Sequence, residues 1–415
     1  MADQEHKPSQ SPDPTEPADP DAARPPATPG TGADSHDDAA ETVYDASSGA
    51  AAEDRVAVAS QFQLMWWRFR RHRLAMFGGI VILLFYSVVV FADFLAYASP
   101  HASEAERSLM PPQRVYLFDD GSFSPHVFGL DSRRNPQTFQ REYFANPDDK
   151  IELSFFAEGF EYNLFGFIPT NRHLIGTAND REIGESVFLL GTDVQGRDMW
   201  SRLMYATRIS LTIGLVAVIV SIALGVVMGG LSGFYGGWVD MVVQRMMELL
   251  YSIPTIPLWM GLAAAVPDHW SILRIYFAIT VIIALIGWTE LARVVRGRLL
   301  ALREEDFVMA ANLAGASQFR VIFVHLVPLV LSHIIAAVSL ALPAMIVAET
   351  SLSFLGLGLR PPAVSWGVLL QGAQNIQAVA LTPWLLLPAI PVIVVILAFS
   401  FLGDGLRDAA DPYGM

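Results

Sequence analysis

Six long stretches of the chain are rich in aliphatic residues and contain almost no charged side chain. An α-helix of about 20 such residues, rising about 1.5 Å per residue, crosses the roughly 30 Å hydrocarbon core of a bilayer. We therefore expect an all-α integral membrane protein with six transmembrane helices. The predicted spans are residues 74–92, 209–231, 249–267, 275–289, 326–348 and 381–403.

The polar segments divide the chain further. Residues 1–55 are rich in Pro, Ala, Asp and Ser, which predicts a disordered acidic cytoplasmic tail, inert or regulatory, rather than a signal peptide. Residues 56–99 hold an N-terminal helix and the first span, and 100–205 form an enlarged extracytoplasmic insert between the first two spans. The remaining predicted parts are a five-helix core at 206–403, its cytoplasmic loop at 298–328 and a cytoplasmic tail at 404–415.

Arginines indicate the orientation in the membrane. One group precedes the first span, and another lies between the fourth and fifth spans. Cytoplasmic loops carry an excess of Lys and Arg, so both groups indicate the cytoplasmic side. Six spans then place both termini in the cytoplasm and the insert outside. The groups are Arg68, Arg70, Arg71 and Arg73, and Arg293, Arg296, Arg298, Arg303 and Arg320.

The composition supports a membrane protein and narrows its chemistry. The chain is 16% charged, below the roughly 25% of a soluble domain. Most of the net charge of −14 lies in the acidic tail, and we expect no nucleic-acid partner. The chain has no cysteine for disulfides or thiolate metal sites. Its lysines are Lys7 and Lys150, and neither ends a glycine-rich phosphate loop, so any ATP hydrolysis must belong to a partner.

The predicted cytoplasmic loop contains an amphipathic helix. Phe307, Ala310, Ala311 and Ala314 recur at helical spacing and share one face. The alanines would let another protein approach closely, and Phe307 would supply a buried anchor. Gly315 suits the left-handed residue that often follows the last turn of a helix.

Three acids open this helix. Glu304, Glu305 and Asp306 lie in its first turn, where they complement the helix dipole. Ser317 can cap a second, short helix. A helix lying in the lipid headgroups is the alternative interpretation, but acids disfavour it because anionic lipids attract Lys and Arg.

A polar turn with two glycines precedes the second span. It contains Asp193, Gly196, Arg197 and Asp198, and Arg202 follows. Opposite charges this close can pair locally and fix the outer mouth of the span. The turn is therefore either a structural element or a surface that contacts another protein, which the family resemblance described below implies to be an extracytoplasmic binding protein.

Several residues in or near the spans are candidates for a translocation path or gate. Pro254, close after Ser252, would kink the third span and free backbone carbonyls beside a pathway, although helix packing also accounts for a kink. Glu248 and Glu349 lie near span ends, with Ser353 one turn beyond Glu349. Ionisable residues in such positions are functional hypotheses by default.

Local pairing is the structural alternative for these glutamates. Glu248 is three residues from Arg245, and Glu290 is three residues from Arg293, a spacing that brings side chains together on a helix. Glu349 could reach water at the end of its span. No His, Asp, Glu and Cys set has the spacing of a metal site, so we expect no bound metal.

Residues 310–328 resemble the "EAA" loop of ATP-binding-cassette importer permeases. That signature reads Glu-Ala-Ala, three residues, Gly, nine residues and Ile-x-Leu-Pro. Ala310, Ala311, Gly315 and Pro328 match at this spacing, whereas Met309 replaces the Glu. We therefore expect contact with an ATPase to rest on the alanine face, its phenylalanine and the preceding acids.

Other segments narrow the resemblance to the "C"-type permeases of the dipeptide, oligopeptide and nickel family. They follow the order and predicted topology of that family over roughly residues 60–99 and 188–415. The segments are 190–198 with 201–203 and 208–211, 233–237 with Asp240, Glu349 with 352–358 and 366–367, and 406–408 with 411–412.

The resemblance implies a bacterial inner-membrane permease that pairs with a second, similar permease. Two cytoplasmic ATPases would use ATP and Mg²⁺, this chain would bind no cofactor, and a binding protein would deliver substrate. Closure of the ATPases would push on residues 307–314 and switch the spans between two packings. Peptides are the implied cargo, with nickel complexes, glycosides and peptide antibiotics as alternatives.

Two other classes of function compete with this interpretation. A stand-alone secondary transporter or channel would carry charged groups at mid-membrane and discontinuous helices in repeated halves. A membrane enzyme would gather His, Asp and Glu at one face. The predicted spans are nearly free of charge and show neither pattern clearly.

Overall fold

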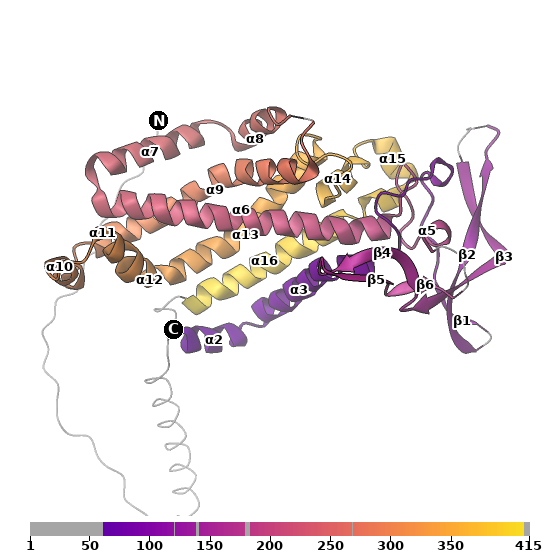
Figure 1. Cartoon of the computed structure of the whole chain (residues 1–415), viewed down its shortest axis with the longest axis horizontal. Helices are drawn as coiled ribbons and strands as arrows, with labels where there is room; N and C mark the ends of the chain where they lie inside the picture. Colours follow the sequence, from indigo (N-terminus) through magenta and orange to yellow (C-terminus); the bar gives the residue numbers. More distant parts are fainter. Residues whose placement is uncertain (1–60, 120, 138–140, 179–182, 268, 411–415) are drawn as a thin grey trace, which may run out of the picture. The chain divides into compact units, whose positions relative to one another are not determined.

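The computed structural model describes residues 61–119, 121–137, 141–178, 183–267 and 269–410 (Figure 1). The predicted acidic tail at 1–55 lies outside the described residues, as do residues 411–415. The first described element is α2 (Gln61–Arg71), which corresponds to the predicted N-terminal helix.

Within the described ranges, five helices are long and apolar enough to cross a membrane. Each overlaps one predicted span, and Figure 1 shows them lying side by side. The last helix continues beyond residue 403, so the described part of the predicted C-terminal tail is helical. The five are α3 (Arg73–Val90), α6 (Met199–Tyr235), α9 (Ile272–Leu302), α13 (Leu331–Phe354) and α16 (Ala389–Ala410), with the 3-10 turn η3 (Pro383–Leu386) preceding α16.

The third predicted span is two helices rather than one. α7 (Gly237–Ser252) and α8 (Thr255–Ala264) are separated by Ile253 and Pro254, both with extended backbone. Proline holds the preceding residue in extended conformations, so α7 ends where Pro254 requires it to. The predicted kink is therefore a complete break. Figure 1 shows α7 and α8 following one another along the bundle.

Glycines let α6 and α9 pack closely. Gly225, Gly229 and Gly233 recur every four residues on α6 and meet α9. A Cβ at Gly229 would lie 2.5 Å from the carbonyl oxygen of Ala292, inside any permitted contact. Small residues at such a crossing allow the two backbones to touch, which is how helices associate where lipid replaces water.

The insert between α3 and α6 contains β-strands, so the prediction of an all-α protein is wrong for this segment. Four strands form an antiparallel sheet in the order β1-β2-β3-β6, and β4 and β5 form a separate hairpin. The insert ends at the start of α6, earlier than the predicted residue 205. The strands are β1 (Tyr116–Asp119), β2 (Ser122–Arg134), β3 (Arg141–Phe155), β4 (Glu158–Leu164), β5 (Ile168–Arg172) and β6 (Ile175–Thr177).

The remaining elements of the described residues are short helices and helical turns. Figure 1 shows α2 and α10 at one end and the strands at the other. The short elements are α4 (Ala92–Leu95), η1 (Ala105–Arg107), α5 (Ile183–Ser186), α10 (Asp306–Leu313), α11 (Gln318–Arg320), the π-helical turn η2 (Val321–Leu326), α12 (Val327–Leu329), α14 (Trp366–Gln371) and α15 (Ile376–Leu381).

Candidate functional site

Helix α10 is attached to the bundle by a buried valine. Val308 is 1% exposed and belongs to an apolar cluster that includes Val321 and Leu326. Ala311 is partly buried against the same cluster. Phe307, the predicted anchor for a partner protein, is exposed in this chain, and Val308 is the residue that attaches the helix to the bundle. Val308 is buried because the apolar cluster that it packs against is formed by α9 and by the residues after α10.

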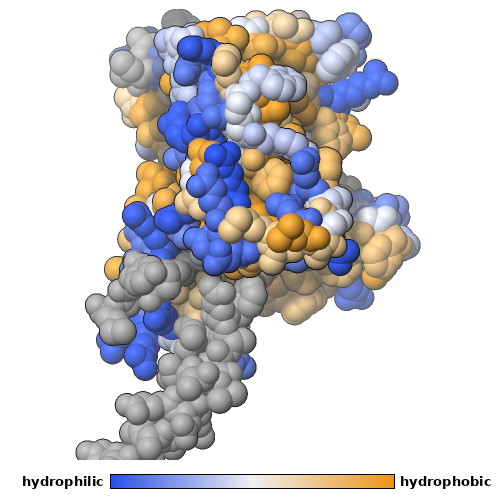
Figure 2. Space-filling model, turned by 90° about the vertical axis from the view of Figure 1, so that its left-hand side faces the viewer, coloured by the Kyte–Doolittle hydropathy of each residue, from blue (hydrophilic) through white to orange (hydrophobic). Residues whose placement is uncertain are grey.

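The opposite side of α10 is turned away from the bundle. Phe307, Met309, Ala310 and Ala314 are exposed, and Leu313 is 90% exposed. Single exposed apolar residues are ordinary, but several on one short helix form a patch that suits another protein. Figure 2 looks onto this end of the molecule, where hydrophobic and hydrophilic residues are exposed together. We call residues 307, 309, 310, 313 and 314 the α10 outer face.

The end of α10 has the predicted geometry. Gly315 adopts a φ of 79°, and its N–H donates to the carbonyl of Asn312 at 3.0 Å. The hydroxyl of Ser317 accepts a hydrogen bond from the N–H of Arg320 and caps α11. Pro328 lies in α12, which directly continues the π-helical turn η2.

The three acids before α10 are exposed. Glu304 lies 3.3 Å from the guanidinium of its neighbour Arg303, whereas Glu305 occupies the N-cap position without a capping side-chain bond. Of the three acids predicted in the first turn, Asp306 lies there, whereas the prediction is wrong for Glu304 and Glu305 because α10 begins only at Asp306. These carboxylates border the α10 outer face and give it a negative edge.

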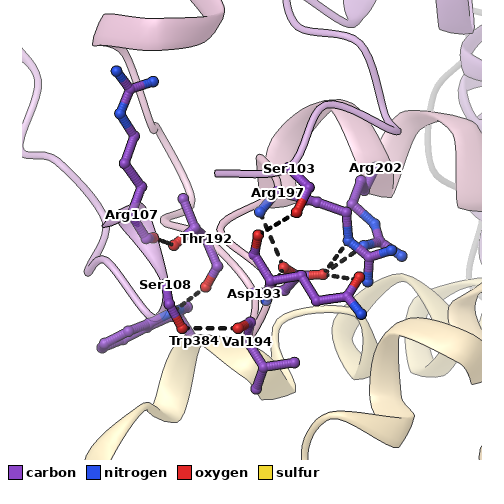
Figure 3. A network of polar contacts seen from close by, with 10 residues as sticks. Ser103, Arg107, Ser108, Thr192, Asp193, Val194, Arg197, Arg202 and Trp384 are labelled. Atoms are coloured by element: carbon purple, nitrogen blue, oxygen red, sulfur yellow. Dashed lines mark hydrogen bonds and ion pairs between the residues drawn. The ribbon is translucent and has the colours of Figure 1, made fainter. Parts of the chain in front are cut away.

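At the other end of the bundle, Asp193 is the centre of a buried polar network (Figure 3). Its carboxylate accepts hydrogen bonds from the backbone N–H groups of Gln195 and Arg197 at 2.8 and 3.0 Å and from Nε of Arg197 at 2.8 Å. The guanidinium of Arg202 also donates to it. Arg202 is 1% exposed, so Asp193 is needed to offset the cost of burying its charge.

The turn around Asp193 is held by residues from outside it. Gly196 has a φ of 73°, and a Cβ there would lie 1.9 Å from the carbonyl oxygen of Glu104. The indole N–H of Trp384 donates to the carbonyl of Thr192 at 3.0 Å. Two serine hydroxyls bind further carbonyls of the turn, namely Ser103 to Gln195 and Ser108 to Val194 (Figure 3).

Asp198 caps α6 instead of pairing with an arginine. Its carboxylate accepts hydrogen bonds from the N–H of Ser201 at 2.7 Å and from the hydroxyl of Tyr97 at 2.8 Å. Burial raises the pKa of Asp198 to about 6, because removal from water costs more than these bonds return. The local pairing that the sequence predicts therefore occurs at Asp193, which pairs with both Arg197 and Arg202, and not at Asp198. The burial of Asp193, Gly196 and Asp198 favours a structural role for the turn.

Glu349 is buried among hydroxyl groups, not near water as its place in the sequence suggests. It is 0% exposed, and its carboxyl accepts hydrogen bonds from Ser210 of α6 at 2.9 Å and from Ser353 at 2.8 Å. The hydroxyl of Ser210 in turn accepts the backbone N–H of Trp366 at 3.1 Å. Among the described residues no cationic side chain pairs with Glu349. Glu349 thus links α13 to α6 and α14.

The other path candidates lie elsewhere. Glu248 is exposed on α7 and pairs with Arg245 at 2.6 Å, as the local alternative predicts. Ser252 and Pro254 are exposed at the break between α7 and α8. The predicted pairing of Glu290 with Arg293 does not occur among the described residues. The guanidinium of Arg293 instead lies over the ring of Tyr251, 4.8 Å from its centroid. The five path candidates therefore form two separate groups. Glu248, Ser252 and Pro254 lie on α7 and at its end, and Glu349 and Ser353 lie on α13.

Two families match this chain. Residues 221–413 match the binding-protein-dependent transport system inner membrane component, and residues 60–112 match the N-terminal transmembrane domain of oligopeptide transport permease C. The oligopeptide transport system permease protein OppC of Haemophilus influenzae is 38% identical over 55% of this chain and 71% of its own length. This chain belongs to the permease family of ATP-binding-cassette importers. The resemblance that the loop at 310–328 predicts is confirmed.

Other relatives of the permease agree with this assignment. OppC of Escherichia coli is 39% identical over 60% of this chain and 79% of its own, and the dipeptide permease DppC of Bacillus subtilis is 37% identical over 54% and 68%. A solved methionine transporter, MetNI in an inward-facing form, is similar at a TM-score of 0.39 and 19% identity over 50% of this chain and 96% of that chain, and the assignment does not rest on it. Neither family match includes residues 113–220, which contain the six strands.

Proposed function

We propose that this permease and a second, similar permease form the translocation path of an importer for peptides. The oligopeptide and dipeptide permeases among its relatives support the cargo. The observation that carries the coupling to ATP is the α10 outer face. It is apolar, edged by acids and held on the bundle by Val308.

Two cytoplasmic ATPases and an extracytoplasmic binding protein complete the proposed importer. ATP and Mg²⁺ bind the ATPases, because neither lysine of the permease follows a glycine-rich phosphate loop. The α10 outer face docks on one ATPase, and the equivalent helix of the second permease docks on the other. Met309 occupies the place of the signature acid, so Glu304, Glu305 and Asp306 supply the negative charge of the contact.

The proposed topology has six crossings in the bacterial inner membrane. α3, α6, α9, α13 and α16 each cross once, and α7 and α8 together make the third crossing. An even number brings both termini to one side, and the arginines before α3 and around α10 support the cytoplasmic side. The insert with its strands is then extracytoplasmic.

Force passes from α10 into the bundle through the Val308 cluster. Val308 contacts a cluster that includes Leu299 of α9 and Ile334 of α13. A push on α10 therefore reaches two long helices at once, and packed helices respond by switching between discrete arrangements. The Glu349 network holds α6, α13 and α14 together, so we expect these three to move as one body.

A matched pair of alanines tests the docking assignment. Ala310 lies on the α10 outer face, whereas Ala301 is also exposed but lies in the last turn of α9. Ala310→Arg should abolish co-purification of the ATPases, or their stimulation by substrate-loaded binding protein, while Ala301→Arg leaves both intact. Normal coupling in the purified Ala310→Arg complex would show that α10 is not the docking helix.

A further inference from the structure

The β4–β5 hairpin has an apolar tip that transport does not account for. Residues 164–169 contain no charged side chain. Phe165, Phe167 and Ile168 are all exposed, and Phe167 is 73% exposed. Three large apolar side chains at one turn are unusual for a hairpin that meets only water.

The tip lies next to the outer end of α3. This helix has 18 residues and is about 27 Å long, close to the thickness of the hydrocarbon core. Phe91, the next residue, therefore lies near the outer boundary of that core. The ring of Phe165 is 5.7 Å from the ring of Phe91. Figure 1 shows β4 and β5 beside this end of the bundle, whereas β1 lies farther from the helices.

The apolar surface is continuous from α3 to the hairpin. Leu83, Leu84 and Val90 are exposed along α3, the side chains that a spanning helix presents to lipid. Phe91 is also exposed and contacts Phe165. Aromatic side chains are enriched at the headgroup level of membrane proteins, because their rings suit the boundary between hydrocarbon and water.

The backbone conformation at Phe165 is unusual for an aromatic residue. Phe165 has a φ of 56°, in the left-handed region that Gly or Asn adopts more easily. Gly166 follows with a φ of 82°, and the N–H of Gly166 donates to the carbonyl of Asn163 at 3.0 Å. A phenylalanine at this position therefore keeps a large apolar ring where the turn alone would favour a small or polar residue.

We propose that the tip of the β4–β5 hairpin, residues 165–168, inserts into the outer leaflet of the bilayer and anchors the insert beside the outer mouth. The evidence is the uncharged, exposed tip and its ring contact with the end of a spanning helix. The inference requires that α3 crosses the membrane but does not depend on peptides as the cargo.

Spin labelling tests the insertion directly, because the chain has no cysteine of its own. Phe167→Cys would carry a nitroxide in the complete importer, made with cysteine-free partner subunits and reconstituted in phosphatidylethanolamine–phosphatidylglycerol vesicles. Phe123→Cys is the matched control, since Phe123 is 62% exposed near the β1–β2 turn. Ile168→Cys provides a second site in the tip. Collision rates with oxygen, which concentrates in lipid, and with a water-soluble nickel complex are measured at each label.

The labels at 167 and 168 should collide more often with oxygen than with the nickel complex, and the label at 123 should show the reverse. A label at 167 and 168 with the aqueous pattern of 123 would overturn the proposal. Shielding from both reagents would overturn it as well, because another protein subunit would then cover the tip.

Discussion

Two residues of the outer turn, Gly196 and Asp198, are held in positions that few substitutions can occupy. Gly196 needs a left-handed backbone and has no room for a Cβ. Asp198 is buried, and its two oxygens serve Ser201 and Tyr97. The turn thus fixes the start of α6 through backbone geometry and hydrogen bonds, both of which single substitutions can test.

Gly196→Ala should destabilise the folded permease by about 2 kcal/mol or more, because the new Cβ meets the carbonyl of Glu104. Gly121→Ala is the control, since Gly121 has a similar φ of 84° and no atom within 4 Å of a Cβ. That control should cost only about 1 kcal/mol, from backbone strain alone. Thermal unfolding in detergent measures both, and equal losses would contradict the clash.

Asp198→Asn should remove a pH dependence of stability. The folded-state pKa is raised to about 6 from 3.8, so the native state binds the proton more tightly and wild-type stability falls as pH rises from about 4 to 6. The change is at most ~3 kcal/mol. The Asn variant keeps the acceptor for Ser201 but cannot ionise. Its melting temperature relative to wild type should therefore increase between pH 4 and pH 7, and a constant difference would contradict the account.

Sequence alone could find Glu349 but not its surroundings. Its position near the end of an apolar run suggested access to water, yet α13 extends to Phe354 and buries it. Its partner Ser210 is 139 residues away along the chain, a contact that no local pattern contains. Val308 was missed for the same reason, since its burial depends on residues that follow α10.

At the scale of elements, α10 combines an inner and an outer face on eight residues. Val308 points into the cluster shared with α9 and α13, and Leu313 is among the most exposed apolar residues. The two faces have different proposed roles: the inner face holds the helix on the bundle, and the outer face binds the ATPase. Substitutions on the two faces should therefore have different effects, one on stability and the other on coupling to the ATPase.

Val308→Ala should lower the stability of the permease by about 2 kcal/mol, because it leaves a small cavity in a packed cluster. Leu313→Ala should leave stability nearly unchanged but reduce the stimulation of ATP hydrolysis by substrate-loaded binding protein. Thermal unfolding without the ATPases and ATPase assays of the complete importer measure the two effects. Loss of stability in the Leu313 variant, or unimpaired coupling, would contradict this division.

Elements in the bundle could be predicted because an uncharged run of sufficient length has few alternatives to a spanning helix. The strands of the insert could not, since β3 is mostly polar and its apolar alternation, at Ile151, Leu153 and Phe155, covers only the last five residues. The break at Pro254 was visible as a proline but not as two helices. Whether a proline kinks a spanning helix or divides it in two depends on whether neighbouring helices stabilise the continuous helix.

At the scale of the whole molecule, the two ends of the bundle have different chemistry. One end presents α10 with its exposed apolar face, and the other carries the strands and the buried Asp193 network (Figure 1). An importer driven from the cytoplasm needs this asymmetry, because ATP acts on one side and substrate arrives on the other.

Uptake of a labelled oligopeptide into proteoliposomes shows whether this permease imports peptides at the expense of ATP. The vesicles contain the permease, its second permease and the two ATPases, with the binding protein added outside and ATP enclosed within. We expect accumulation that requires ATP and the binding protein and that Ala310→Arg abolishes. Accumulation by the permeases alone, without the ATPases, would contradict it and indicate a stand-alone transporter.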